Sequence, residues 1–246
     1  MNIEHPVSNQ ISQLKALWQQ AFGDTDGEID AFFNVGFSKN RCLCATWDNR
    51  VAAALYWFDC TLEGKKIAYL YAIATEQSFR GRGIASKLIA AVHKHLQSSG
   101  YAGAVLVPSE ESLFGFYEKC GYTAFGGICE FTCQKAGSPV PLSKISKRAY
   151  AALRKNFLPK GSILQEDALL DCLNAFYQGE DFICVALERN GKLFVPELLG
   201  NTEKAPQILA AFGLETGAFR TSGNHRRFAM FCPFEMLPTP PILVLL

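Results

Sequence analysis

The sequence predicts an α/β protein with a mixed central sheet, followed by a second, smaller α/β domain. Three observations lead to this prediction. Apolar runs of strand length alternate with amphipathic helical segments in both halves of the chain. A loop with two glycines, at 80–86, joins a predicted strand to a predicted helix. A stretch rich in Gly, Pro and Ser at 134–143 separates the halves, so we expect domains at 1–137 and 138–246.

Two helices and a set of strands are expected before the loop. The segment from Ser12 to Phe22 carries its apolar residues on one helical face, and Gly23 follows where helices commonly end. A second helix is expected over 28–37. Strands are expected over 42–47, over 51–60 and in a run that ends near Thr75. The pattern leaves open whether 62–71 is one strand or two.

The loop at 80–86 opens a helix that we expect over 83–97. Ile84, Leu88, Val92 and Leu96 recur at four-residue spacing, which is typical of one apolar helix face. A strand over 102–107 and a helix around Tyr117 are expected next.

The second half repeats the alternation of helices and strands. Helices are expected over 147–156, 166–176 and 202–212. Strands are expected over 182–188, 192–199, 217–221 and 227–231, with a further edge strand over 242–246. Asn190-Gly191 is a hairpin turn signal between the first two of these strands.

The loop at 80–86 is suited to holding a phosphate group. A helix N-terminus carries about half a positive charge and unpaired N–H groups, and glycine lets the backbone approach a ligand. The P-loop pattern is absent from the chain. The dinucleotide pattern is incomplete, because Gly81-Arg82-Gly83 lacks the third glycine and no acidic residue ends the next strand. A third pattern, Arg/Gln-x-x-Gly-x-Gly/Ala, is met by the run from Arg80 to Ala85.

This third pattern is the pyrophosphate-binding motif of the GCN5-related N-acetyltransferases (GNAT), and the sequence resembles that family. A second signature of the family, a helix with a tyrosine followed by Glu-Lys-x-Gly-Phe/Tyr, is met by Tyr117-Glu-Lys-Cys-Gly-Tyr122. The resemblance covers residues from about 10 to about 135, and it implies the GNAT fold.

The second half resembles the same family without its motif. Leu198 to Lys204 stands where the glycine pair and arginine are expected, so we interpret 138–246 as a degenerate GNAT-like domain. The arrangement is distantly similar to tandem acetyltransferases of the enhanced-intracellular-survival type, whose N-terminal helix also resembles the run from Leu17 to Phe22.

The resemblance implies acetyl-CoA as a co-substrate and assigns residues to it. Backbone groups of Ile73, Ala74 and Thr75 are expected to meet the pantetheine arm at the end of a splayed strand. The pyrophosphate is expected at Arg80, Gly81, Arg82, Gly83, Ile84, Ala85 and Ser86. The alternative interpretation of the two arginines is an ordinary solvated helix start.

Tyr117 is the expected general acid, which would protonate the departing coenzyme A thiolate. The alternative is a core tyrosine in an aromatic helix. The asparagine that the family usually carries before this tyrosine is absent, and the run from Pro108 to Ser112 stands there instead.

Glu76 is the first candidate for the general base, because it follows the strand end where an amine should enter. It could equally be a solvated loop carboxylate, with a water chain or the carboxylate of Leu246 as the base. Cys120 is expected to pack in the core, since no histidine lies near it in the sequence.

Composition excludes several other functions. A net charge of +1 gives no electrostatic case for nucleic acid or an acidic membrane. The nine cysteines form no Cys-x-x-Cys pair, so no metal site is expected. With no leader or membrane-spanning run, a cytoplasmic protein is expected.

We therefore expect an acetyl-CoA-dependent N-acetyltransferase that acts on a small-molecule or peptide amine. The alternatives are a non-catalytic acyl-CoA-binding or partner-binding module, and a transferase of a different acyl group. The acceptor and the oligomeric state are not predicted.

Overall fold

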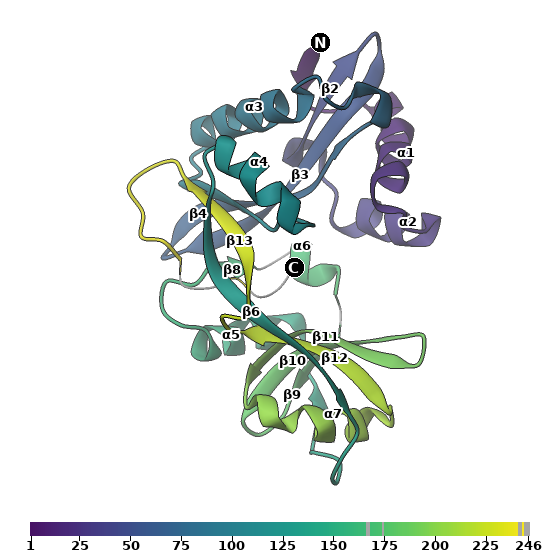
Figure 1. Ribbon diagram of the computed structural model, residues 1–246, viewed down its shortest axis with the longest axis vertical. Coiled ribbons are helices and arrows are strands. Elements are labelled where there is room, and N and C mark those ends of the chain that lie inside the picture. The colour runs from purple at the N-terminus through teal and green to yellow at the C-terminus, as the bar shows by residue number, and fades with distance from the viewer. Residues whose placement is uncertain (166–167, 174, 241–242, 244–246) are drawn as a thin grey trace. The chain divides into compact units, whose positions relative to one another are not determined.

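The computed structural model describes residues 1–165, 168–173, 175–240 and 243 (Figure 1). The chain forms two compact units. The first comprises Met1–Thr123, Asp167–Cys172 and Met230–Leu237. The second comprises Ala124–Glu166, Leu173–Ala229 and Pro238–Leu246. The boundary at 137/138 stays a prediction.

A mixed sheet forms the first unit. Its strands follow the order β1-β2-β3-β4-β5, and the last residues of β13, Met230 to Pro233, pair with β5. Only β4 and β5 in this set run parallel, with Ile67 opposite Gly103, and the other pairs are antiparallel. The strands are β1 (Asn2–Glu4), β2 (Cys42–Trp47), β3 (Arg50–Leu62), β4 (Lys65–Thr75), β5 (Gly103–Leu106) and β13 (Arg226–Pro233). In the segment 62–71, which the sequence left open, Leu62 ends β3 and Lys65 begins β4.

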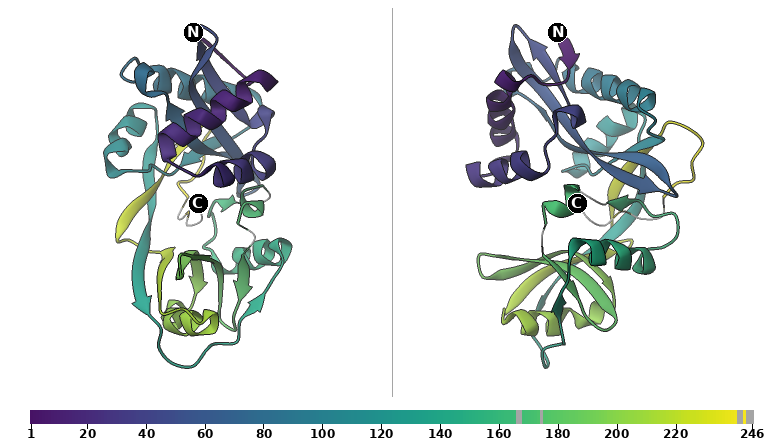
Figure 2. Two further views of the ribbon diagram at one scale, coloured as in Figure 1. Left: turned by 90° about the vertical axis from the view of Figure 1, so that its right-hand side faces the viewer. Right: turned by 180° about the vertical axis from the view of Figure 1, so that it is seen from behind.

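Helices cover both faces of this sheet. Helices α1 (Ile11–Phe22) and α2 (Asp26–Val35) lie on one side of it, and α3 (Ile84–Ser98) lies on the other (Figures 1 and 2). The face of α3 expected to be apolar is buried, as the four-residue spacing predicts. The short helices α4 (Phe114–Lys119) and α6 (Ala168–Asp171) complete the unit.

Local sequence sets where these helices begin and end. The α2 N-terminus has a capping box, in which the Thr25 side chain accepts from the Glu28 N–H and the Glu28 carboxylate accepts from the Thr25 N–H. The α1 C-terminus is closed by Gly23, whose φ of 73° is the left-handed conformation that glycine adopts readily.

The second unit is built on the strand order β6-β12-β11-β10-β9-β7. Its strands are β6 (Thr123–Gln134), β7 (Ser143–Lys144), β8 (Leu164–Gln165), β9 (Phe176–Gln178), β10 (Phe182–Arg189), β11 (Lys192–Gly200) and β12 (Thr216–Ser222). Its helices are α5 (Lys147–Phe157) and α7 (Ala205–Phe212). Strands β11 and β12 are parallel and the other described pairs in this order are antiparallel, so this sheet is mixed as well.

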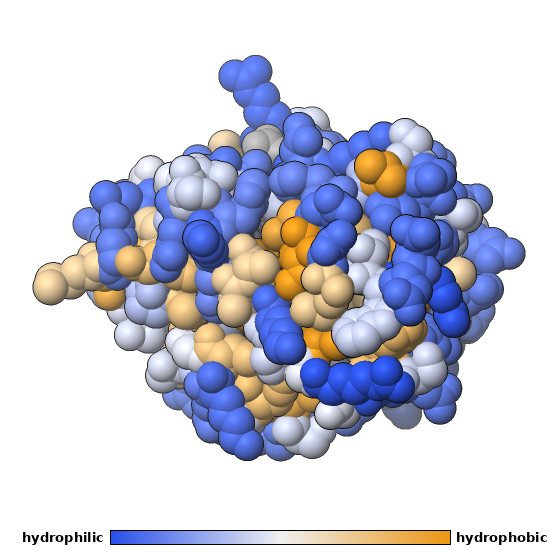
Figure 3. Space-filling view, turned by 90° about the horizontal axis from the view of Figure 1, so that it is seen from above, coloured by the Kyte–Doolittle hydropathy of each residue, from blue (hydrophilic) through white to orange (hydrophobic). Residues whose placement is uncertain are grey.

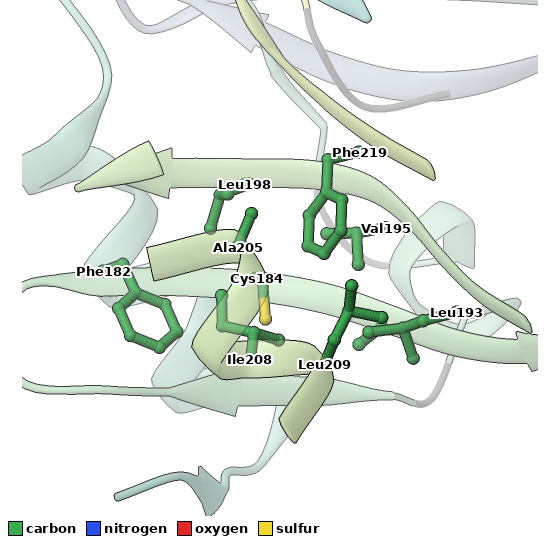
Figure 4. Close-up of a cluster of buried hydrophobic side chains, with 10 residues drawn as sticks. Phe182, Cys184, Leu193, Val195, Leu198, Ala205, Ile208, Leu209 and Phe219 are labelled. Atoms are coloured by element: carbon green, nitrogen blue, oxygen red, sulfur yellow. The ribbon is translucent and has the colours of Figure 1, made fainter. Parts of the chain in front are cut away.

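One hydrophobic core joins α7 to this sheet. Ala205, Ile208 and Leu209 of α7 pack against Cys184, Leu193, Val195 and Phe219 of the strands (Figure 4). A polar cluster is also buried in the unit. The Arg154 guanidinium meets the Glu197 carboxylate at 2.7 and 2.8 Å, and the Tyr150 hydroxyl donates to the same carboxylate at 2.6 Å.

The helix expected over 166–176 was wrong in extent: α6 spans only Ala168–Asp171, and β9 begins at Phe176. Pairing of β9 with β10, with Gln178 opposite Ile183, fixes that segment as extended chain and overrides its helical pattern. The edge strand expected over 242–246 lies outside the described residues, apart from Leu243.

Candidate functional site

The last residues of β4 extend beyond the part of this strand that pairs with β5. Its described pairing with β5 runs from Ile67 to Tyr69, whereas β4 continues to Thr75. Ala72 has a φ of +48°, and the register with β3 shifts between Ala54 and Tyr56. This is the signature of a β-bulge, which bends a strand and breaks its pairing. The peptide groups of the last residues of β4 therefore have an unpaired edge toward the β5 side.

The loop after β4 places two left-handed glycines before α3. Gly81 has a φ of +76° and Gly83 a φ of +70°. Gly83 is the N-cap of α3 and supplies no side chain to the first N–H groups of that helix, at Ile84, Ala85 and Ser86. A Cβ built on Gly83 meets no atom within 4 Å, so the space beside this residue is open. The loop can therefore present several N–H groups to an anion.

These segments share one pocket of about 660 Å³ in the first unit. Nine of the predicted coenzyme residues line it: Ile73, Ala74, Thr75, Arg80, Gly81, Gly83, Ile84, Ala85 and Ser86. Tyr117, the predicted acid, lines the same pocket. The segment 73–86 and Tyr117, some thirty residues apart in the sequence, thus meet at one cavity.

Arg82 and Glu76 are the two predicted site residues that are not among the lining residues. The Arg82 guanidinium lies 5.5 Å from the centre of the Phe79 ring. The Glu76 carboxylate accepts from both the hydroxyl and the backbone N–H of Ser78. The hydroxyl bond is the main reason that the pKa of Glu76 lies below its usual value. A carboxylate with a lowered pKa is a weaker proton acceptor, so the geometry gives no support to Glu76 as the base.

Tyr117 is buried, with 7% of its surface exposed, on the short helix α4. Its ring lies 5.1 Å from that of Phe116 and 6.0 Å from that of Tyr122. Burial raises the pKa of the Tyr117 phenol to about 12, with a smaller contribution from Cys120. The phenol therefore keeps its proton at neutral pH, which is the state that a proton donor requires.

The pocket also has walls that the sequence did not indicate. They are Ala21, Phe22, Phe79, Ser109, Glu110, Leu113 and Phe116. Ser109 and Glu110 follow β5, and ligands in α/β sheets bind outside the carboxyl ends of the strands. This rule would have predicted Ser109 and Glu110 as residues near the ligand. Ala21 and Phe22 end α1, and no local signal in the sequence connects them to the loop at 80–86.

The surface and the helices add two observations. From above, hydrophilic side chains cover most of the visible face, and hydrophobic ones gather near its middle (Figure 3). None of the helices in the described part of the chain is long and apolar enough to span a membrane.

A GCN5-related N-acetyltransferase from Anabaena variabilis has a similar fold, with a TM-score of 0.71 and 16% identity over 94% of this chain and 72% of that chain. A putative acetyltransferase from Pyrococcus horikoshii has a TM-score of 0.69 and 12% identity over 99% of this chain and 91% of that chain.

Eis1 from Mycobacterium abscessus has a TM-score of 0.66 and 13% identity over 95% of this chain and 74% of that chain. At these identities the likeness is one of fold, and it confirms the predicted fold class. No curated protein sequence matches the chain. The family model for the acetyltransferase (GNAT) domain matches residues 2–125. The chain therefore belongs to the GNAT family of acyltransferases.

Proposed function

We propose that the protein transfers an acetyl group from acetyl-CoA directly to the amine of a small molecule or peptide. The observation that carries this proposal is the convergence of the end of β4, the loop at 80–86 and Tyr117 on one pocket. Each of the three would have one role in the reaction. The end of β4 would bind the pantetheine arm, the loop at 80–86 would bind the pyrophosphate, and Tyr117 would donate a proton.

The N–H groups at the start of α3 are assigned to the pyrophosphate, because they point out of a helix N-terminus whose cap leaves them free. The peptide groups of Ile73 to Thr75 are assigned to the amides of the pantetheine arm. An arm of this kind can add to the open edge of β4 as an extra strand does. This would aim the thioester along β4 toward Tyr117.

The chemical step is an attack of the amine nitrogen on the thioester carbonyl carbon. The new C–N bond forms, the C–S bond breaks, and coenzyme A leaves as a thiolate. Tyr117 donates its phenolic proton to that sulfur. A donor with a pKa of about 12 is protonated at neutral pH, so its proton is in place when the thiolate develops.

The base that takes the proton from the amine is not assigned to one group. Glu110 is a carboxylate that lines the pocket, and it accepts from the Ser112 hydroxyl at 3.1 Å. Glu76 does not line it, and the carboxylate of Leu246 lies outside the described residues. A water chain in the pocket is the remaining route.

A coenzyme A release assay with a panel of amines tests the proposal. Purified protein is mixed with acetyl-CoA and each amine, and free thiol is measured together with the mass of the product. Amine-dependent thiol release with an acetylated product supports the proposal. Binding of acetyl-CoA without turnover on any amine favours the non-catalytic module, and turnover only with a longer acyl-CoA favours a different acyl group.

A further inference from the structure

A thiol and an imidazole meet in the second unit, whereas the pocket is lined by residues of the first. Cys129 lies on β6, and His225 lies in the turn between β12 and β13. The Sγ of Cys129 is 3.2 Å from the Nδ1 of His225, which is within hydrogen-bond reach for sulfur. Cys129 is half-buried and His225 is exposed, so reagents in water can reach the pair.

The backbone holds the two side chains together. Strand β12 pairs with β6 so that Thr221 faces Cys129, and the Gly223 N–H donates to the Gly127 carbonyl at 3.1 Å. A Cβ on Gly127 would lie 2.5 Å from the Gly223 oxygen, and one on Gly223 would lie 2.8 Å from the Cys129 Cβ. Only glycine fits this close approach of the turn to β6. The turn therefore fixes the place of the imidazole.

The chemistry of the pair follows from this contact. An imidazole within hydrogen-bond reach of a thiol can take up its proton, and the thiolate that results is the nucleophilic form of sulfur.

Cys133 provides an internal comparison. It lies four residues further along β6 and is half-buried like Cys129, but it packs against the core beneath α7. Burial raises the pKa of its thiol. Burial likewise raises the pKa values of Cys120 and Cys172. Cys129 differs from these three in its contact with an imidazole.

We propose that Cys129 is a nucleophilic thiol activated by His225, and that it is a modification site for hydroperoxides. The thiolate sulfur attacks one peroxide oxygen, a S–O bond forms and the O–O bond breaks. Sulfur loses two electrons to become a sulfenic acid, and the peroxide is reduced. The departing oxygen takes the imidazolium proton and leaves as water or an alcohol.

Dilute hydrogen peroxide with dimedone as the trapping reagent tests the proposal on the full-length protein at neutral pH. Peptide mass spectrometry then measures the labelling rate of each cysteine. We expect Cys129, which contacts an imidazole, to be labelled at least about tenfold faster than Cys133, which does not. The fast label should disappear in the C129S variant.

The decisive variant is His225→Gln, which removes the ionisable imidazole from an exposed turn. We expect it to slow labelling of Cys129 about tenfold, with the Cys133 rate unchanged. Asn224→Ala is the matched control, since it alters the same turn and keeps the imidazole. An equal Cys129 rate in wild type and His225→Gln overturns the proposal, as does a Cys129 rate no faster than that of Cys133. Because labelling of Cys133 reports the packing of the same strand, unfolding of a variant would be visible as a faster Cys133 rate.

Discussion

The Nε of Arg80 donates a hydrogen bond to the backbone carbonyl of Thr75 at 3.1 Å. This bond connects the first residue of the glycine loop to the last residue of β4. The two parts of the site proposed for the pantetheine arm and for the pyrophosphate are thereby held at a fixed spacing. Arg80 thus has a positioning role in addition to its charge.

Replacing this arginine should weaken coenzyme binding more than replacing its neighbour. Arg80→Ala removes a charged donor that lines the pocket and frees the Thr75 carbonyl. Since hydrogen bonds of charged groups contribute about 1.5–3 kcal/mol, we expect the Kd for acetyl-CoA to rise at least about tenfold. Arg82→Ala is the control, because that guanidinium lies over the Phe79 ring and not among the lining residues. Equal losses in the two variants, measured by titration calorimetry, would count against the role of Arg80.

Removing the Tyr117 hydroxyl should lower turnover and leave coenzyme binding intact. General acid catalysis contributes about 10²–10⁴ in rate, so we expect kcat of Tyr117→Phe to fall by a factor in that range. Because we assign the phenol hydroxyl a role in the transition state and none in the binding of acetyl-CoA, the Kd for acetyl-CoA should stay within about twofold of the wild-type value. Steady-state kinetics and calorimetry together provide the two values.

Tyr122→Phe is the matched control for that variant. The two rings are neighbours, but the Tyr122 hydroxyl is bonded to the Nε2 of His93 at 2.7 Å. Its loss should reduce stability by about 1 kcal/mol and leave kcat near the wild-type value. If both variants lost turnover equally, the effect would lie in the packing of α4 and not in proton donation.

Much of the fold could be predicted from local patterns. The face of α3 with Leu88 and Val92 was clear, because its buried residues recur with helical spacing. The strand Cys42–Trp47 was clear as a short run of consecutive buried residues. Pairing between distant segments could not be predicted in this way. The contact of Met230 with Leu106 and the extended conformation of Phe176 are both fixed by partner strands.

The candidate site shows the same division. The loop residues and Tyr117 could be proposed from the sequence because their motifs are local, and they line one pocket. The bulge at Ala72 could not be predicted from the sequence. A bulge adds one residue to a strand, and a continuous apolar run has the same pattern with or without that residue. Glu76 was chosen from its position after the strand, and its bond to Ser78 depends on a 3₁₀ turn that the sequence did not indicate.

Stability should fall as the pH is lowered from about 6.5 to about 4. Burial lowers the pKa of His93 from 6.5 to about 4, so the unfolded chain takes up a proton that the folded chain resists. This contribution is fully present above the unfolded value and is lost as the pH falls toward the folded value. At 1.36 kcal/mol per pH unit the loss amounts to about 3 kcal/mol.

Urea unfolding at a series of pH values checks this prediction. His93→Gln is the variant of choice, because its amide can still bond the Tyr122 hydroxyl and does not titrate. Between pH 6.5 and pH 4, we expect the free energy of unfolding of the variant to fall by less than that of the wild type, and the difference should be most of the ~3 kcal/mol. An unchanged slope would assign the acid sensitivity to other groups.

Removing one partner of the buried Arg154–Glu197 ion pair in the second unit should lower the free energy of unfolding strongly. Glu197→Leu leaves the Arg154 guanidinium, 2% exposed, without its carboxylate, and such losses cost about 3–5 kcal/mol. The double variant with Arg154→Met removes both charges and should be less destabilised than the single variant. Urea unfolding of wild type, both single variants and the double variant gives the coupling. A double variant no more stable than Glu197→Leu would contradict this account.

The measurement that tests the central claim most directly is calorimetric titration of acetyl-CoA into wild-type protein, Gly83→Glu and Gly64→Glu. Both glycines have a positive φ, 70° and 79°, and a Cβ on either meets no atom within 4 Å, so the backbone strain of the two variants is matched. Gly64 lies in the turn before β4, at the opposite end of that strand from the loop. The account predicts micromolar binding to wild type and to Gly64→Glu, and none detectable to Gly83→Glu, where a carboxylate would face the pyrophosphate. Equal binding to both variants, or no binding to the folded wild-type protein, would contradict it.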